Sequence, residues 1–225
     1  MTHRLIVAID GPSGVGKGTV ARAVASALGY RHLDTGAMYR GVAWRALEDG
    51  VPLDDEAALS RLAGRTAIDA SDRIVRVDGR DITGLIRNPD IDRAAARVAR
   101  VPGVRSVLVE RQRALGADGG VVVEGRDIGT VVFPGAEVKV YLDASAEERA
   151  RRRALDASHR GAGDLAQVST ELAARDASDR GRPVSPLAVA SDAHLIDTTG
   201  LSIDEVVARV LAVVARADRG SQASG

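Results

Sequence analysis

A glycine-rich run with one lysine, residues 11–19, has the composition of a phosphate-binding loop. It consists of Gly11, Pro12, Ser13, Gly14, Val15, Gly16, Lys17, Gly18 and Thr19. The spacing G-x-x-x-x-G-K lets backbone N–H groups converge on phosphate oxygens, and the lysine adds a flexible positive charge. A helix that follows the loop would point its positive N-terminus at the same phosphates. The run predicts a site for the phosphates of a nucleotide; the alternative is a turn that only joins a strand to a helix.

The residue after Lys17 departs from the common form of this loop. Serine or threonine usually follows the lysine directly and holds Mg²⁺, whereas here Gly18 follows and Thr19 comes one position later. The pattern G-x-x-G-x-G-K-G-T is similar to the loop of nucleoside monophosphate kinases. That similarity implies a metal held mainly through phosphates, water molecules and a more distant carboxylate.

Arginines near the ends of predicted strands are the second set of residues that could do chemistry. A phosphate acceptor is already anionic, so its phosphorylation needs cations that hold two phosphates in line rather than a strong base. Suitably placed arginines are Arg40, Arg126, Arg149, Arg151, Arg152 and Arg153. Arg126 directly follows a buried strand, where open α/β sheets have their ligand crevice. For any one of the others, a solvated helix face or an i,i+4 ion pair is the alternative.

Apolar runs separated by helical patterns define the elements that must position these residues. We predict strands at 5–10, 31–33, 121–123, 138–142 and 193–197. Helical patterns lie between most of them, which indicates an α/β fold with a parallel five-stranded sheet and helices on both faces. Asp78-Gly79 between alternating residues predicts a hairpin within 74–82. The last helix opens with a capping box at Ser202 and Glu205, and we expect a disordered tail at 219–225.

The composition restricts the classes of partner. Basic and acidic residues number 31 each and cancel, which argues against a long nucleic-acid footprint. Cysteine is absent, so disulfides and thiolate metal sites are excluded and a reducing compartment is permitted. No apolar run approaches the ~18 residues of a membrane span, and too few residues precede the first strand for a signal peptide. We expect a cytoplasmic monomer that acts on small molecules, with no nucleic-acid or membrane partner.

Three further motifs, together with the loop, closely resemble those of bacterial cytidylate kinases. They are Asp34-Thr35-Gly36-Ala37-Met38-Tyr39-Arg40, the run from Glu124 to Pro134, and Arg175-Asp176-x-x-Asp179-x-x-Arg182. The resemblance spans nearly the whole chain, and the run at 125–134 is far more specific than the loop. It implies one phosphate-loop (P-loop NTPase-like) kinase domain over residues 1–225, with an enlarged monophosphate-binding insert at about 35–102 and a short helical lid at about 149–166. It also implies transfer of the γ-phosphate of ATP to CMP or dCMP with Mg²⁺ as cofactor, in pyrimidine nucleotide metabolism.

The same resemblance implies a role for each matching residue. Loop residues 11–19 would bind ATP. The residues implied to act in catalysis are Lys17, Arg126, Arg149 and Arg153. Those implied to bind CMP are Thr35, Arg40, Arg105, Arg126, Asp127, Arg175, Asp179 and Arg182. Arg40 and Arg126 would hold the phosphate of CMP. Arg175 and Asp179 would face the ribose. Arg105, Asp127 and Arg182 would face cytosine. Glu124 is the carboxylate expected near Mg²⁺.

Some positions stay open or receive no role. Ala96 stands where some family members have a serine that touches the base, so one contact to base or sugar is open. The histidines, His32 among them, lack metal-ligand spacing with one another, and we assign them no catalytic or metal role. Tyr39 and Trp44 are expected in the core or in the wall of a pocket.

Three alternatives use the same phosphate-binding loop. The first is another kinase of this fold, acting on UMP, AMP or a small metabolite such as shikimate. The second is a GTP-driven switch, which would need an Asn-Lys-x-Asp guanine reader, but the single asparagine, Asn88, precedes a proline. The third is a nucleotide-binding regulator without catalysis. Turnover assays with competing substrates separate these alternatives from the cytidylate kinase hypothesis.

Overall fold

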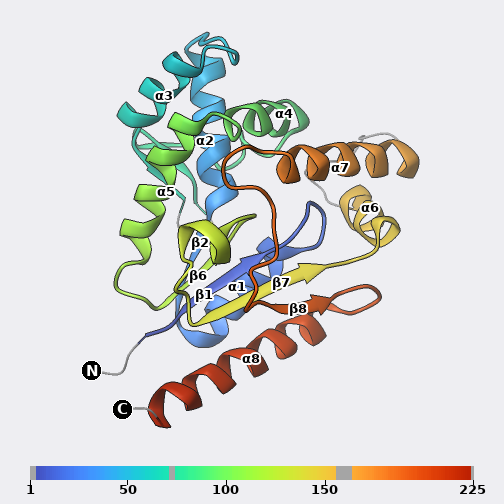
Figure 1. Cartoon of the computed structure of the whole chain (residues 1–225). Coiled ribbons are helices and arrows are strands. Elements are labelled where there is room, and N and C mark those ends of the chain that lie inside the picture. Colours follow the sequence, from blue (N-terminus) through green and yellow to red (C-terminus); the bar gives the residue numbers. More distant parts are fainter. Residues whose placement is uncertain (1–3, 71–73, 156–163, 224–225) are drawn as a thin grey trace.

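A parallel sheet with strand order β2-β6-β1-β7-β8 lies at the centre of the computed structural model, which describes residues 4–70, 74–155 and 164–223 (Figure 1). Its strands are β1 (Ile6–Asp10), β2 (Arg31–Asp34), β6 (Val121–Glu124), β7 (Val138–Asp143) and β8 (His194–Asp197). Every pairing in the sheet is parallel. These are the five strands predicted from the sequence, so the α/β fold class is confirmed.

The two faces of the sheet carry separate cores, because successive side chains of a strand point to opposite faces. Val7 and Ile9 of β1 pack with α1 (Lys17–Leu28) and α8 (Ile203–Ala223). Ala8 and Val123 belong to the other core, which contains the helices between β2 and β6. Figure 1 shows α8 below the sheet, α1 behind its strands and the other helices above and beside it. All five strands end on the same side, and that edge carries the loops that matter for function.

The monophosphate-binding insert predicted at 35–102 is a group of helices with a small antiparallel sheet. Its helices are α2 (Thr35–Glu48), α3 (Glu56–Arg65) and α4 (Pro89–Val98), and α5 (Pro102–Gly116) leads back to the main sheet. The predicted hairpin is present as β4 (Arg76–Val77) and β5 (Arg80–Asp81), with positive φ at Asp78 and Gly79. The sequence did not indicate the third strand, β3 (Ile68–Asp69), because two residues are too short for a period.

The predicted lid falls on two packed helices. They are α6 (Ala146–Leu155) and α7 (Leu165–Arg180), which enclose a small core of Ala150, Val168 and Leu172. The sequence placed a glycine break at 161–163, which lies outside the described residues. Figure 1 shows α6 and α7 at the side of the sheet where β7 ends.

Two elements differ from the sequence prediction. A turn of π-helix, η1 (Ile128–Val132), occupies the run after β6, where Phe133 N donates to Ile128 O at 2.7 Å. The last helix was expected to end before residue 219, but α8 continues to Ala223. Its final turns contain no proline, and a single glycine such as Gly220 costs a helix only ~1 kcal/mol. The prediction of a disordered tail from 219 is therefore wrong as far as Ala223.

Candidate functional site

The phosphate-binding loop joins β1 to α1, as the sequence predicted, and its glycines are required by its shape. Gly11, Gly14 and Gly16 all have positive φ. A Cβ on Gly11 would lie 2.2 Å from the backbone oxygen of Leu142, so the loop passes directly against β7. No other residue type fits there without a shift of backbone.

Lys17 begins α1 and its side chain turns back into the loop. Its Nζ donates to the Pro12 carbonyl at 2.6 Å, and the side chain is buried. Burial, together with the positive charge of Arg126, lowers the pKa of Lys17 well below its usual value. An anion beside this ammonium would favour the charged form, so the geometry suits a phosphate.

Gly18, where the loop departs from its common form, lies against the side chain of Glu124, which leaves little room for a Cβ atom. A Cβ at position 18 would lie 3.0 Å from Oε1 and 3.2 Å from Oε2 of Glu124. The carboxylate of Glu124, at the end of β6, therefore rests on the first turn of α1. Its Oε1 pairs with Nε2 of the buried His32 at 3.0 Å, and its backbone oxygen accepts from Thr35 Oγ1 at 2.6 Å.

The residues after β6 are fixed by a carboxylate at the end of β1. Asp10 accepts from the backbone N–H groups of Ile128 and Gly129 at 2.9 and 2.8 Å. Burial raises the pKa of Asp10 to about 6, although these two hydrogen bonds oppose the shift. These hydrogen bonds fix the start of η1 and therefore the position of the preceding residues, Arg126 and Asp127. Arg126 lies beside the phosphate-binding loop, where it contacts Ser13.

Arg126 lies between the loop and α7. Its Nε donates to Asp179 Oδ2 at 2.9 Å and its Nη2 to Ser13 Oγ at 2.8 Å. Asp179 also pairs with Arg182. Burial would raise the pKa of Asp179, but the guanidinium groups of Arg126 and Arg182 outweigh it and lower the pKa. The family resemblance implies that Asp179 faces the ribose, and in the structure Asp179 also orients two of the predicted arginines.

Arg105 and Asp127 form a buried ion pair at the far end of the site. The side chain of Arg105 is 2% exposed, and its Nε has no hydrogen-bond partner among the described residues. The guanidinium carbon lies 5.4 Å from the ring centroid of Tyr39, close enough for a cation–π contact. Burial raises the pKa of Tyr39 to about 12, so the phenol stays neutral. Tyr39 is thus a wall of the pocket, one of the two places expected for it.

Asp92, which sequence analysis did not single out, binds arginines from three other helices. Oδ1 accepts from Arg40 Nε of α2 at 3.0 Å, and Oδ2 accepts from Arg153 Nη2 of α6 at 2.5 Å. Arg175 Nη1 of α7 lies 3.7 Å from Oδ2. The available signal was an aspartate on the apolar face of α4, beside the buried Ile91 and Ala95. Buried carboxylates are rare unless they are paired, so such a position points to a cation.

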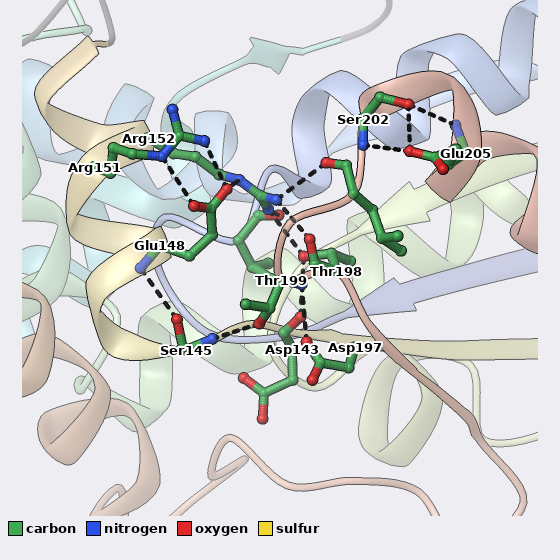
Figure 2. Close-up of polar contacts among 12 residues, drawn as sticks. Asp143, Ser145, Glu148, Arg151, Arg152, Asp197, Thr198, Thr199, Ser202 and Glu205 are labelled. Carbon is green, nitrogen blue, oxygen red and sulfur yellow. Dashed lines mark hydrogen bonds and ion pairs between the residues drawn. The ribbon is translucent and has the colours of Figure 1, made fainter.

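Each arginine of α6 has a different set of partners, although Arg151 and Arg152 share Glu148. Arg149 pairs with the buried Asp176 and donates to the Ser13 carbonyl at 3.1 Å. Arg152 donates to the Val15 carbonyl at 3.1 Å. It also donates to Thr198 in the loop after β8, as Figure 2 shows. Arg151 pairs with Glu148 at the surface, as Figure 2 also shows.

One cavity of about 730 Å³ collects most of the predicted residues. Those that line it are Ser13, Gly14, Val15, Gly16, Lys17, Gly18, Thr19, Thr35, Arg40, Arg105, Glu124, Arg126, Asp127, Arg153, Arg175, Asp179 and Arg182. Gly11, Pro12 and Arg149 are not among the lining residues, and Arg149 instead donates a hydrogen bond to the Ser13 carbonyl of the loop. Ala96, the position left open, also lines the cavity.

The family model and the curated relatives agree on one family. The family model for cytidylate kinase matches residues 7–216. A cytidylate kinase from Geobacillus sp. (strain WCH70) is 48% identical over 95% of this chain and 98% of its own length. One from Pasteurella multocida is 45% identical over 95% of this chain and 96% of its own. Among solved structures, a gluconokinase from Sinorhizobium meliloti shares the fold, with a TM-score of 0.51, 20% identity and coverage of 100% of this chain and 98% of its own.

Proposed function

This chain belongs to the cytidylate kinase family, and from that membership we propose that it transfers the γ-phosphoryl group of ATP to CMP or dCMP with the help of Mg²⁺. The observation that carries the proposal is that a single cavity joins the phosphate-binding loop to a group of buried arginines. A donor phosphate on the loop and an acceptor phosphate among the arginines can then meet in line.

At the donor end, backbone groups do most of the binding. The N-terminus of α1 and the loop N–H groups would hold the ATP phosphates, and Lys17 would place a positive charge on the transferring group. Leu201, Ile203 and Val206 also line the cavity, and such an apolar wall suits a nucleoside base. Arg149 and Arg152 keep the loop in shape through its Ser13 and Val15 carbonyls.

At the acceptor end, side chains do the binding. Arg40 and Arg126 would hold the phosphate of CMP, because both are half-buried and line the cavity. Arg153 reaches the same group from α6 and would balance charge that moves between the two phosphates. No general base is needed, since the acceptor oxygen is already anionic near neutral pH.

Recognition of cytosine would rest on Asp127 with Arg105 and Arg182. Cytosine presents an amine donor at N4 and acceptors at N3 and O2, whereas uracil presents an acceptor at O4 and a donor at N3. A carboxylate accepts from the cytosine amine and repels O4 of uracil, and an arginine donates to N3 or O2. The buried Arg105–Asp127 pair has both functions side by side.

The residues beside the loop fit a magnesium ion that is bound chiefly by phosphates and water. Mg²⁺ prefers oxygen ligands and keeps several waters. Among the described residues no group of three side chains could hold a metal by itself, and the carboxylate of Glu124 lies against Gly18 in the first turn of α1. When bound, the ion would neutralise charge on the phosphates. We assign Glu124 to its hydration shell.

Two further statements stay predictions from the sequence: that the protein acts as a monomer and that it is cytoplasmic. In the part of the chain that the structure describes, no helix has the length and apolar character that a membrane crossing needs.

A coupled assay of ADP release, with CMP, dCMP, UMP, AMP and shikimate offered in turn, tests the proposed function. We expect CMP and dCMP to give turnover with an efficiency at least about tenfold above that of any other acceptor. A preference for UMP, AMP or shikimate would assign the chain to another kinase activity. ATP binding without turnover on any acceptor would contradict a kinase function.

A further inference from the structure

Asp92 joins the acceptor side of the cavity to the lid helix α6. It is buried on α4, and its two carboxylate oxygens have different partners. Oδ1 accepts from Arg40, the residue assigned to the acceptor phosphate, at 3.0 Å. Oδ2 accepts from Arg153 of α6 at 2.5 Å. One carboxylate therefore fixes two guanidinium groups from elements far apart in the sequence.

Two other arginines of α6 contact the donor side. Arg149 donates to the carbonyl of Ser13, and Arg152 donates to the carbonyl of Val15, both in the phosphate-binding loop. Arg152 is also tied to Thr198, as Figure 2 shows. A continuous series of contacts thus runs from Arg40 through Asp92 and Arg153 along α6 to the loop.

Electrostatics give the negative charge of Asp92 a further effect. Arg175 lies 3.7 Å from Asp92, and burial together with Arg126 lowers the pKa of Arg175 to about 10, an effect that Asp92 opposes. Arg40 is held in the charged form by Asp34 and Asp92, which outweigh burial and raise its pKa. Without the charge of Asp92, these guanidinium groups would repel one another across the cavity.

We propose that Asp92 is a positioning residue that couples the two substrate sites, so that binding of the donor nucleotide favours binding of the acceptor and the reverse. The proposal rests on the proposed kinase function. A ligand that orders Arg40 also orders Arg153 and α6 through the shared carboxylate, and the second ligand then finds its arginines already placed. By linkage the effect is reciprocal, and each nucleotide raises the affinity of the other by the same factor.

Calorimetric titration of CMP, with and without a nonhydrolysable ATP analogue and Mg²⁺, measures this coupling directly. For the parent chain we expect CMP to bind at least about fivefold more tightly when the analogue is present. In Asp92→Asn, which keeps the shape and removes the charge, the ratio should fall to within about twofold of one. Asp92→Glu, which restores the charge, should recover part of it.

Asp90→Asn is the matched control, because Asp90 is an exposed carboxylate on the same helix that pairs only with Arg93 in the described contacts. This variant should keep the parent ratio. If Asp92→Asn does not fold, Arg153→Gln breaks the same ion pair from the other helix and should show the same loss.

The outcomes separate the two proposals. A parent chain that binds no CMP would contradict the proposed function itself. A parent ratio near one, or a folded Asp92→Asn variant (or Arg153→Gln in its place) that keeps the parent ratio, would overturn the role of Asp92 and leave the kinase function intact. A further readout is kinetic: at saturating ATP, Asp92→Asn should raise KM for CMP more than it lowers kcat.

Discussion

The two ends of the cavity are built by different means. At the donor end, the shape comes from a contiguous run of residues whose backbone conformation is fixed by glycines, as at Gly11 against β7. At the acceptor end, the shape comes from side chains of the segment after β6 that pair with side chains of separate helices, as in Arg105–Asp127 and Arg126–Asp179. A local motif can therefore specify phosphate binding, whereas selection of the acceptor depends on how distant elements pack.

Replacement of Lys17 is expected to have the largest effect, because it removes the charge of the donor end and leaves its backbone unchanged. Lys17→Ala should lower kcat/KM by about 10³ or more, which corresponds to about 4 kcal/mol of transition-state stabilisation. Lys17→Met, which keeps the length of the apolar stem, should show the same loss. Steady-state kinetics and a thermal melt on each variant measure activity and folding. Activity within tenfold of the parent would remove Lys17 from the phosphate site.

Asp10, at the end of β1 where the phosphate-binding loop begins, also holds η1 after β6. Its raised pKa predicts how the stability of the protein depends on pH. Because burial raises the pKa from 3.8 to about 6, the folded chain binds this proton more tightly than the unfolded chain. The stability that the protonated group contributes is complete below about pH 4 and is lost as pH rises through 6. Relative to Asp10→Asn, which does not titrate there, the parent should lose up to about 3 kcal/mol of unfolding free energy between pH 4 and pH 7.

Urea unfolding of both proteins at four pH values across this range measures the difference. Subtraction cancels carboxylates with the opposite dependence, such as Asp179, whose pKa is lowered. A difference that does not change with pH would mean that Asp10 is not the buried acid described here.

The neighbouring Arg151 and Arg152 offer a smaller and sharper test of how α6 supports the donor end. Both arginines pair with Glu148, but Arg152 also donates to carbonyls of the loop and of Thr198. Arg152→Ala should lower the unfolding free energy by about 1–3 kcal/mol, because it removes the Arg152 donor from the half-buried Val15 carbonyl and leaves Thr198 O only the Leu201 N–H. Arg151→Ala should change it by less than about 0.5 kcal/mol. If urea unfolding gave the same change in unfolding free energy for both variants, the contacts of Arg152 to the loop would not contribute to stability.

The sequence predicted what local patterns determine. The five strands and the loop follow from apolar runs and glycine spacing over a few residues. The hairpin follows from Asp78-Gly79, because that pair suits positive φ. The sequence also showed that Gly18 departs from the common form of the loop, but only the fold shows that the carboxylate of Glu124 lies against this position.

The rest depends on long-range packing. Asp92 is separated by 52 residues from Arg40 and by 61 from Arg153, and no spacing in the sequence relates them. The first N–H groups of the π-helix η1 donate to Asp10, which lies in β1 and far away in the sequence. The helix propensities of residues 128–132 contain no information about this contact. For the same reason the roles of individual arginines on α6 could be assigned only after their partners were known.

Asp127 tests most directly the claim that side chains at the acceptor end select cytosine. A lost charged hydrogen bond in a closed site costs about 1.5–3 kcal/mol, so Asp127→Ala should lower kcat/KM for CMP at least about tenfold and for UMP far less. Asp127→Asn serves the same purpose should loss of the Arg105 partner unfold the alanine variant. The measurement is the ratio of kcat/KM for CMP to that for UMP in parent and variant. A fall in that ratio is the predicted result, whereas equal losses for both acceptors would contradict the account.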